Sequence, residues 1–466
     1  MKWTAAIAFF LTTGVLFAQG PAGSNVIAPR EIRWDPFLDT LQGKTVEYFL
    51  EQSDPATGLT KDRAPSPSPS SIAAIGFALT VYPVAAEREI ISREEAARRS
   101  FNTLSYLFRL PQGPDRTGVA GYRGLFYHFL RREDGLRNRR TELSTIDTGL
   151  LMAGVLFAQS YFDGKSAVEK SIRALADSLY RRVDWKWAMG NGEGLTLEWT
   201  PEKGFSQHTW RGYNEAMIMY ILALGSPTHP LAESVWKVWT SSYVWGKYYG
   251  EEFVSFGPLF GHQYSHCWID YRGIKDEYMR ARGLDYFENS RRATYSQRAY
   301  AVENPGQWKD YSQGVWGVTA CDGPGDTVSV LEGKRRGFWG YRARGVSFDW
   351  VGDDGTIAPT AAGGSLALAP EICIPALKVM RERYGDRVWR RYGFIDAFNP
   401  TFRRERTDEV GWFSDDYIGI DQGPIVIMIE NLRNEFVWNV MKKNRYIVEG
   451  LRRAGFTGGW LDSVRP

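Results

Sequence analysis

The stretch that decides the fold reads Trp210-Arg211-Gly212-Tyr213-Asn214-Glu215, followed by an apolar run from Ala216 to Leu224 and then by Gly225-Ser226-Pro227. An apolar run that ends at glycine and proline predicts a buried helix. A carboxylate at a helix N-terminus, among rings that exclude water, is well placed for acid–base chemistry on a neutral ligand with stacking faces. The alternative is that Asn214 and Glu215 cap the helix and that the rings belong to the core.

Helical patterns recur along the chain, whereas convincing strand patterns are few. We expect helices at residues 37–49, 71–81, 94–110, 144–161, 167–183, 213–224, 231–242, 273–302, 369–384 and 421–441, and short hairpins within 246–262 and 336–350. Long loops connect them at 111–141, 184–212, 246–272 and 303–368, and loops of that length are usually functional. Paired helices with long loops at one end favour an all-α fold, an α/α barrel, although periodicity alone does not distinguish it from a superhelical array.

Composition narrows the class of function. The chain has 466 residues, 43% of them hydrophobic, which is enough for a large single-domain barrel. A net charge of +3 without a dominant basic stripe argues against nucleic acid as a partner. Aromatic residues reach 14% and include 18 Trp, which indicates stacking platforms for sugar rings in addition to core packing.

The N-terminus has the pattern of a secretory signal. Lys2 supplies the positive charge, Ala5 to Phe17 is apolar, and Ala18 is a candidate cleavage residue. We therefore expect a signal peptide at 1–18, a tail at 19–34 and one catalytic domain at 35–466. The mature protein is expected to be periplasmic or secreted, monomeric and free of the membrane.

A proline-rich stretch could mark a domain boundary, and three cysteines could form a disulfide bond. The proline-rich stretch 63–71 lies between two predicted helices, so we interpret it as an extended loop within the domain. Cys267, Cys321 and Cys373 are widely spaced, so at most one disulfide could form, and their spacing gives no zinc motif.

Further carboxylates stand at other predicted helix starts. Glu142 precedes Ser144 and could face a cleft, whereas Asp147 stands three residues after Ser144, a spacing that also suits a capping box. Asp421 begins the helix that contains Ile425 to Ile429, where it could equally be an N-cap. Asp416, four residues after Trp412, is a candidate substrate-binding residue and a reserve candidate for the acidic pair.

Histidines and glycine-rich turns offer other chemistries. His262 and His266 flank Tyr264 and could bind a metal, but hydrogen bonding to sugar hydroxyls suits imidazole better in the absence of an HExxH pattern. The segments 322–325 and 353–356 have the composition of turns. A P-loop, a dinucleotide fingerprint and a GxSxG elbow are all absent from the sequence. Glycoside cleavage, which needs only two carboxyl groups and a stacking cleft, fits this cofactor-free pattern.

The same segments carry a family resemblance. They are Thr141 to Thr148, Trp210 to Pro230, Leu259 to His266, Thr319 to Pro324, Asp354 to Pro359 and Ile418 to Pro424. In this order they resemble the bacterial glycoamylase-like family, which includes endo-β-1,2-glucanases of glycoside hydrolase family 144, over residues 35–445. The resemblance implies an (α/α)6 barrel, a periplasmic or secreted location, and inverting hydrolysis of β-1,2-linked glucan. It does not imply starch as substrate.

Our hypothesis from the sequence is an exported glycoside hydrolase that binds an oligo- or polysaccharide and needs no cofactor or metal. Glu215 is the candidate general acid, because an apolar, ring-lined site raises its pKa, and Asp421 is the candidate base. Glu142 and Asp147 would bind substrate or orient the water. The cleft would be lined by Trp210, Arg211, Tyr213, His262, Tyr264, Trp316 and Trp412. The rival hypotheses are a hydrolase or lyase for another polysaccharide and a non-catalytic glycan-binding protein.

Overall fold

The centre of the computed structural model, which describes residues 29–331, 333–403 and 410–464, consists of buried helices. They are α3 (Ile72–Glu87), α5 (Thr145–Tyr161), α7 (Met217–Leu224), α9 (Tyr264–Trp268), α12 (Pro359–Gly363) and α14 (Gly419–Asn434). Every residue of α7, α9 and α12 is buried. Helices that are apolar on all sides are stable only inside a large core.

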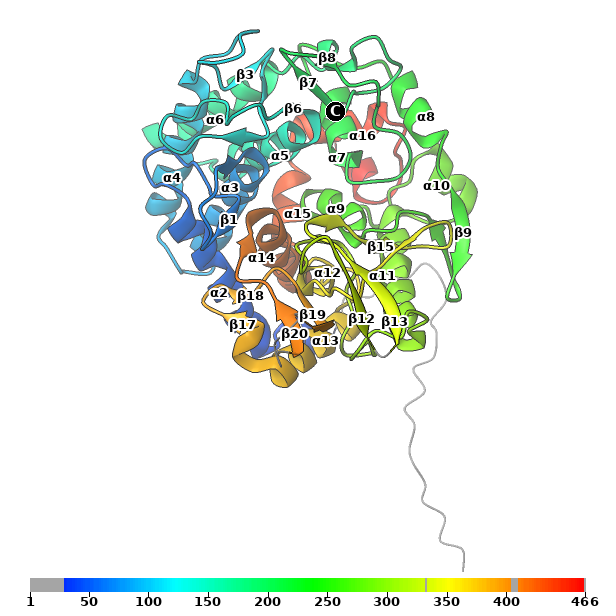
Figure 1. Ribbon diagram of the computed structural model, residues 1–466. Helices are drawn as coiled ribbons and strands as arrows, with labels where there is room; N and C mark the ends of the chain where they lie inside the picture. The colour runs from blue at the N-terminus through cyan, green and yellow to red at the C-terminus, as the bar shows by residue number, and fades with distance from the viewer. Residues whose placement is uncertain (1–28, 332, 404–409, 465–466) are drawn as a thin grey trace, which may run out of the picture.

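The buried helices contact one another in a closed circuit around the centre of Figure 1. α14 packs against α3, α3 against α5, α5 against α7, α7 against α9 and α9 against α14, while α12 packs on α14. Small residues permit the closest approaches. Gly76 of α3 lies against Gly154 of α5. A Cβ atom added to Gly154 would lie only 2.0 Å from the carbonyl oxygen of Gly76.

A second set of helices covers this centre from outside. It comprises α1 (Arg30–Arg33), α2 (Pro36–Gln52), α4 (Arg93–Arg109), α6 (Ala167–Arg181), α8 (Ser234–Thr240), α10 (Glu277–Arg282), α11 (Tyr286–Glu303), α13 (Pro370–Tyr384), α15 (Phe436–Met441) and α16 (Arg445–Arg453). α2 packs on α14, α4 on α3, α6 on α5, α16 on α7 and α13 on α12. In α6, the inward face carries Ile172, Ala176 and Leu179, as expected for an amphipathic helix.

Short strands and 3₁₀ turns fill the connections. The strands are β1 (Arg63–Ala64), β2 (Ser70–Ser71), β3 (Gly121–Tyr122), β4 (Leu125–Phe126), β5 (Phe129–Leu130), β6 (Leu143–Ser144), β7 (Glu198–Thr200), β8 (Gly204–Phe205), β9 (Trp245–Tyr248), β10 (Glu251–Val254), β11 (Ala320–Cys321), β12 (Thr327–Leu331), β13 (Lys334–Phe338), β14 (Arg342–Ala343), β15 (Gly345–Val346), β16 (Val351–Gly352), β17 (Trp389–Arg390), β18 (Gly393–Phe394), β19 (Phe398–Arg403), β20 (Val410–Phe413) and β21 (Tyr417–Ile418). The 3₁₀ turns are η1 (Trp187–Met189), η2 (Leu259–His262), η3 (Gly385–Arg387) and η4 (Gly459–Ser463). The strands pair antiparallel in small sheets of two or three strands.

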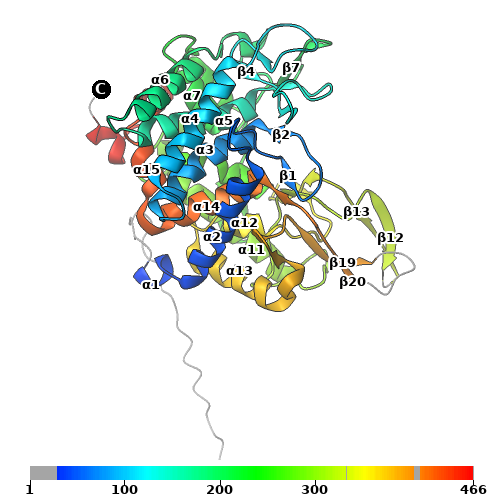
Figure 2. The same cartoon turned by 90° about the vertical axis from the view of Figure 1, so that its left-hand side faces the viewer.

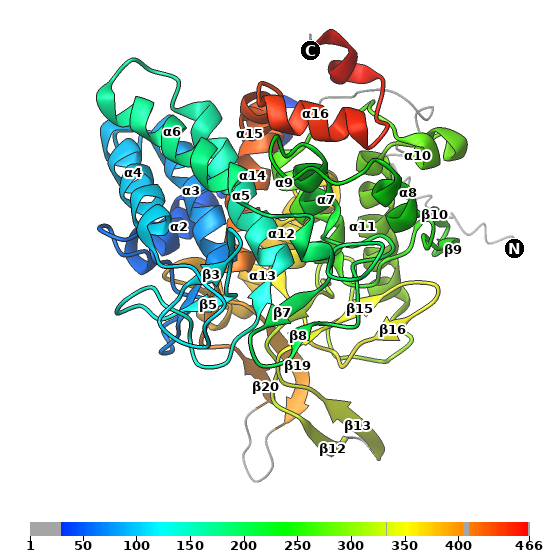
Figure 3. The ribbon, with the colours of Figure 1, turned by 90° about the horizontal axis from the view of Figure 1, so that it is seen from above.

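Most of these strands gather at one end of the helices, as Figures 2 and 3 show. β2, β6 and β21 lead directly into α3, α5 and α14, so these helices begin at that end. Ser71 and Ser144 cap α3 and α5 by accepting hydrogen bonds from the backbone N–H groups of Ala74 and Asp147. The loops at this end therefore sit over helix N-termini.

The predicted helices are confirmed in position, with corrections at their ends. The run 71–81 continues to Glu87 through Pro83. The helix predicted at 213–224 begins only at Met217, so Glu215 lies in the preceding turn. The runs 273–302 and 421–441 are each two helices, because Gly283 and Glu435 adopt the left-handed conformation that ends a helix. The short buried helices α9 and α12 and the helix α16 were missed.

The structure also bears on the expected hairpins, on the cysteines and on the membrane. β9 and β10 form the hairpin predicted within 246–262, and β15 and β16 form one near the end of 336–350. All three cysteines are buried and unpaired. The described helices include none with the length and apolarity that a membrane crossing requires. The predicted signal peptide lies outside the described residues.

Candidate active site

Glu215 is held at the strand-rich end with one carboxyl oxygen unused. Its Oε2 is buried and has no hydrogen-bond partner among the described residues. Burial, together with the nearby charge of Asp147, raises the pKa of this carboxyl to about 7. The side chain of Asn214, rather than Glu215, serves the local turn by accepting a hydrogen bond from the Ala216 N–H at 2.9 Å. Glu215 can therefore carry a proton at neutral pH, and its side chain caps no helix.

Glu142 and Asp147 flank His128. The imidazole Nδ1 lies 2.7 Å from Glu142 Oε1, and its Nε2 lies 3.7 Å from Asp147 Oδ2. Burial lowers the pKa of His128, but Asp147, Glu142 and Asp62 outweigh burial and raise it to about 9. Burial raises the pKa of Glu142, yet the hydrogen bond with His128 holds it below its usual value. A protonated imidazole thus lies between the carboxyl groups of Glu142 and Asp147.

Asp421 lies in the first turn of α14 and is nearly fully buried. It is not the N-cap, because the cap position is Ile418. Burial and the neighbouring Asp396 raise the pKa of Asp421 well above its usual value, and a hydrogen bond joins the two carboxyl groups. Asp396 itself accepts a hydrogen bond at 2.7 Å from the backbone N–H of Asp322.

Arg63 ties this acidic group to the proline-rich loop. Its guanidinium contacts Asp322 at 2.7 Å, Asp62 at 3.3 Å and Asp416 at 3.8 Å. Asp416 also accepts a hydrogen bond at 2.9 Å from the Ser66 N–H. Asp416 therefore holds the loop 63–71 in place, which gives it a structural task in addition to its candidate binding role.

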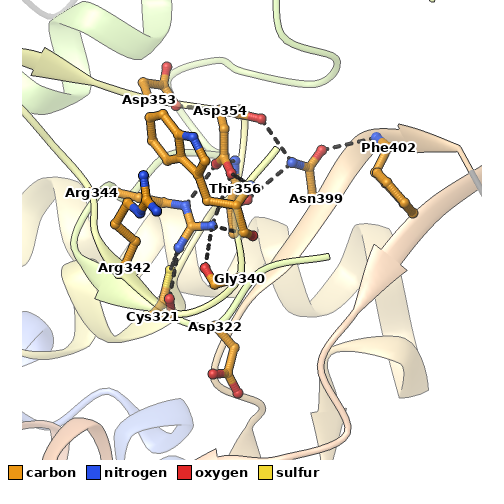
Figure 4. A network of polar contacts seen from close by, with 12 residues as sticks. Cys321, Asp322, Gly340, Arg342, Arg344, Asp353, Asp354, Thr356, Asn399 and Phe402 are labelled. Atoms are coloured by element: carbon orange, nitrogen blue, oxygen red, sulfur yellow. Dashed lines mark hydrogen bonds and ion pairs between the residues drawn. The ribbon is translucent and has the colours of Figure 1, made fainter. Parts of the chain in front are cut away.

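A buried ion pair fixes the loops that carry Asp322 and Tyr341. Arg344 and Asp354 are both fully buried and meet at 2.8 Å, and Arg344 also donates to the carbonyl oxygens of Cys321, Trp339 and Gly340 (Figure 4). This network joins the segment before Asp322 to the segment around Tyr341. Tyr341 is 52% exposed, yet its hydroxyl interacts electrostatically with Asp421 and Asp396. Its ring is thus presented to solvent beside the acidic group.

The electrostatic interactions connect these groups into one site. Glu215 interacts with Asp147, Asp147 with Asp62, and Asp62 with Asp421. Tyr264 is close to both Asp421 and Glu215. Burial raises the pKa of its phenol, and the charges of these two carboxyl groups raise it as well. The structure therefore brings together all four carboxylates predicted from the sequence.

The residues predicted to line the cleft divide into two groups. Trp210 and Trp412 are half-buried, Arg211 is exposed and pairs with Glu193, and Tyr213 and Tyr264 retain a small exposed area. His262 and Trp316 have none. His262 contacts the carbonyl oxygen of Phe256 at 3.1 Å, and burial lowers the pKa of its imidazole to about 3. The side chains of His262 and Trp316 therefore belong to the core, and the prediction that they line the cleft is wrong.

Sequence reasoning missed several members of the site. His128, Asp62, Asp396 and Tyr341 stand in loops, and Arg63 stands in the two-residue strand β1, in each case without a recognisable motif. The segment around Asp322 was interpreted as turn chemistry. The proline-rich stretch 63–71 could have indicated Asp62 and Arg63, which stand at its start. Proline restricts the backbone, and a stiff loop can hold neighbouring side chains in fixed positions.

Fold and site together define a class: a mostly helical protein with a cluster of buried carboxyl groups and aromatic rings at the end where the central helices begin. The chain belongs to the Glycoamylase family, described as "Putative glucoamylase", whose profile matches residues 207–445.

Solved structures and a curated relative resemble the chain over most of its length. It is 32% identical to a protein of the same description from Bacteroides uniformis ATCC 8492, with a TM-score of 0.79 and coverage of 91% of this chain and 98% of that one. An endo-β-1,2-glucanase from Chitinophaga pinensis, solved with sophorotriose and glucose, is 27% identical with a TM-score of 0.78, covering 91% and 99%. The exo β-1,2-glucooligosaccharide sophorohydrolase (non-reducing end) of Parabacteroides distasonis is 28% identical over an alignment of 456 positions, which covers 90% of this chain. The chain spans only 58% of that relative.

Proposed function

We propose that this chain is a glycoside hydrolase that cleaves β-1,2-glucan with inversion at the anomeric carbon. The observation that carries the proposal is the carboxyl of Glu215, which has one buried, unpartnered oxygen and a pKa of about 7 in the same site as Asp421. An acid with that pKa is in part protonated at neutral pH and can donate. The activities printed for the relatives from Chitinophaga pinensis and Parabacteroides distasonis supply the substrate class.

In the proposed reaction Glu215 is the general acid and Asp421 the general base. Glu215 donates its proton to the glycosidic oxygen as the bond from that oxygen to the anomeric carbon breaks. Asp421 takes a proton from the water that attacks the same carbon from the opposite face. Asp147 and Glu142, which flank His128, bind sugar hydroxyls or orient the water. Tyr264 and Tyr341 supply aromatic faces beside the reacting sugars.

The architecture proposed for this chemistry is an (α/α)6 barrel within a single catalytic domain, residues 35–466. Its support is the closed circuit of buried helices and the outer helices that pack on them. The proposed acid and base both lie where a central helix begins, Glu215 just before α7 and Asp421 in the first turn of α14. We further propose that the protein is exported, on the strength of the signal pattern at 1–18.

The test is incubation of the purified protein with a panel of glucans that includes β-1,2-glucan, β-1,3-glucan and starch. We expect cleavage of β-1,2-glucan alone, with a ladder of oligosaccharides as early product and new reducing ends in the α-anomeric form. Early release of a single disaccharide would instead indicate exo action, as the name of the Parabacteroides distasonis relative describes. β-Anomeric product would overturn inversion.

The control variants separate catalysis from binding. Glu215→Gln should lose turnover and keep affinity for β-1,2-glucan oligosaccharides, whereas the exposed Glu193→Gln should keep both. A non-catalytic glycan-binding protein would bind the glucan and show no turnover even in its wild-type form. Cleavage of a uronic-acid polysaccharide with formation of an unsaturated product would favour the lyase alternative.

A further inference from the structure

Asp396 and Asp421 interact with each other, and each has one buried carboxyl oxygen that receives no hydrogen bond from any other described group. Asp421 Oδ2 and Asp396 Oδ1 are buried, and apart from each other neither has a hydrogen-bond partner in the described ranges. The second oxygen of Asp396 is already held by the Asp322 N–H. Ionised carboxylates only accept hydrogen bonds, so the bond between Asp396 and Asp421 requires a proton on one of them.

The surroundings favour a single proton on this pair. Asp322 and Asp62 add negative charge near it, Arg63 adds one positive charge through its contact with Asp322, and Cys321, Tyr264 and Tyr341 are neutral neighbours. Two like charges at hydrogen-bond distance in a buried site cannot both be retained. In line with this, burial and Asp322 raise the pKa of Asp396 to about 7, and burial and Asp396 raise that of Asp421 further above its usual value.

We propose that Asp396 is a positioning residue for the base: it shares one proton with Asp421, orients the Asp421 carboxyl, and sets the pH at which that carboxyl can accept a proton from water. This inference rests on the proposed hydrolysis. It differs from that proposal in assigning a task to a residue that does not touch the substrate.

The proton balance of the step is complete without another reactant. Before the reaction the pair carries one proton and one negative charge. The attacking water forms its bond to the anomeric carbon and gives one proton to Asp421, so the pair becomes neutral. Glu215 gives its proton to the leaving oxygen and becomes an anion. Proton release from the pair and proton uptake by Glu215 from solvent restore the starting state.

The experiment compares wild-type protein with Asp396→Asn, in which an amide donates to Asp421 and carries no titratable proton. Because Asp421 then loses a like-charged neighbour and keeps a donor, the acid limb of the kcat/KM profile should move to lower pH by about one unit or more, while KM changes little. Difference infrared spectra across the pH range should show a protonated carboxyl at neutral pH in the wild type that is missing from the variant.

The matched control is Asp276→Asn. Asp276 is also buried and accepts hydrogen bonds from Trp236 and Tyr286, but it stands outside the site. The Asp276→Asn variant should have a lower melting temperature, and the acid limb of its kcat/KM profile should stay at the wild-type pH. An unmoved limb in Asp396→Asn, or identical infrared spectra, would overturn the inference. If the wild type does not cleave β-1,2-glucan, the proposed function fails, and the infrared comparison still decides whether the two carboxyls share a proton.

Discussion

Replacing Glu215 by glutamine should make the protein more stable at alkaline pH and nearly inactive. The pKa of Glu215 rises from 4.5 to about 7 on folding, so the folded state binds this proton more tightly than the unfolded state. Stability is therefore lost as the pH rises from the unfolded to the folded value, and the full loss is present above about pH 7. A shift of this size corresponds to about 3 kcal/mol.

Glutamine has the shape of the protonated acid and no charge to bury, so Glu215→Gln removes this loss. Unfolding entropy is about 2.1 cal/mol/K per residue, and with 466 residues the gain corresponds to a rise in melting temperature of about 3 °C at alkaline pH. At pH values below the unfolded pKa the gain should vanish. Turnover on β-1,2-glucan should fall by about 10²–10⁴-fold, the usual contribution of a general acid.

The assay is thermal unfolding of the wild type, Glu215→Gln and the exposed control Glu193→Gln, each at an acid and an alkaline pH, with turnover measured in parallel. A stability change in Glu215→Gln that is equal at both pH values would show that Glu215 does not carry the raised pKa. Unaltered turnover would remove Glu215 from the role of general acid and leave Asp147 as the next candidate.

Three further outcomes test other parts of the site. EDTA should leave turnover unchanged, because a carboxyl acid and base supply the chemistry; activity lost to EDTA and restored by Ca²⁺ would contradict this. Tyr341→Ala should raise KM by about fivefold while Tyr341→Phe stays near the wild type, since the ring face supplies the contact; equal effects would assign the role to the hydroxyl. Asp354→Ala should cost about 3–5 kcal/mol of unfolding free energy, measured with denaturant, because Arg344 is left buried and unpaired; a loss below about 1 kcal/mol would show that the pair adds little beyond a surface ion pair.

Helical periodicity was sufficient to place the long helices, because a face buried along several turns leaves a strong pattern. It failed at α9 and α12, which are about one turn long and are recognisable only by their burial. It also failed at Gly283 and Glu435, where one left-handed residue divides an otherwise continuous pattern.

In the candidate site, contacts between residues close in sequence could be predicted, whereas contacts between distant segments could not. Ser144 and Asp147 form the predicted cap, because that interaction spans three residues. The partnership of Asp396 with Asp421, and that of Arg63 with Asp322, join segments that no local pattern relates. His262 was misplaced for the opposite reason: its neighbours in sequence are polar and aromatic, but its neighbours in space form the core.

The span of the Arg63 contacts has a consequence for how activity arises during synthesis. Arg63 reaches Asp322 across 259 residues, and the first turn of α14 adds Asp421 later still. A nascent chain that has emerged as far as Glu215 holds the proposed acid but none of the residues that complete the base. Folding must bring the two ends of the chain together before the carboxyl cluster exists. If the proposed acid and base are correct, fragments that stop short of α14 should be inactive, and hydrolysis should begin only after the C-terminal helices have packed against the N-terminal ones.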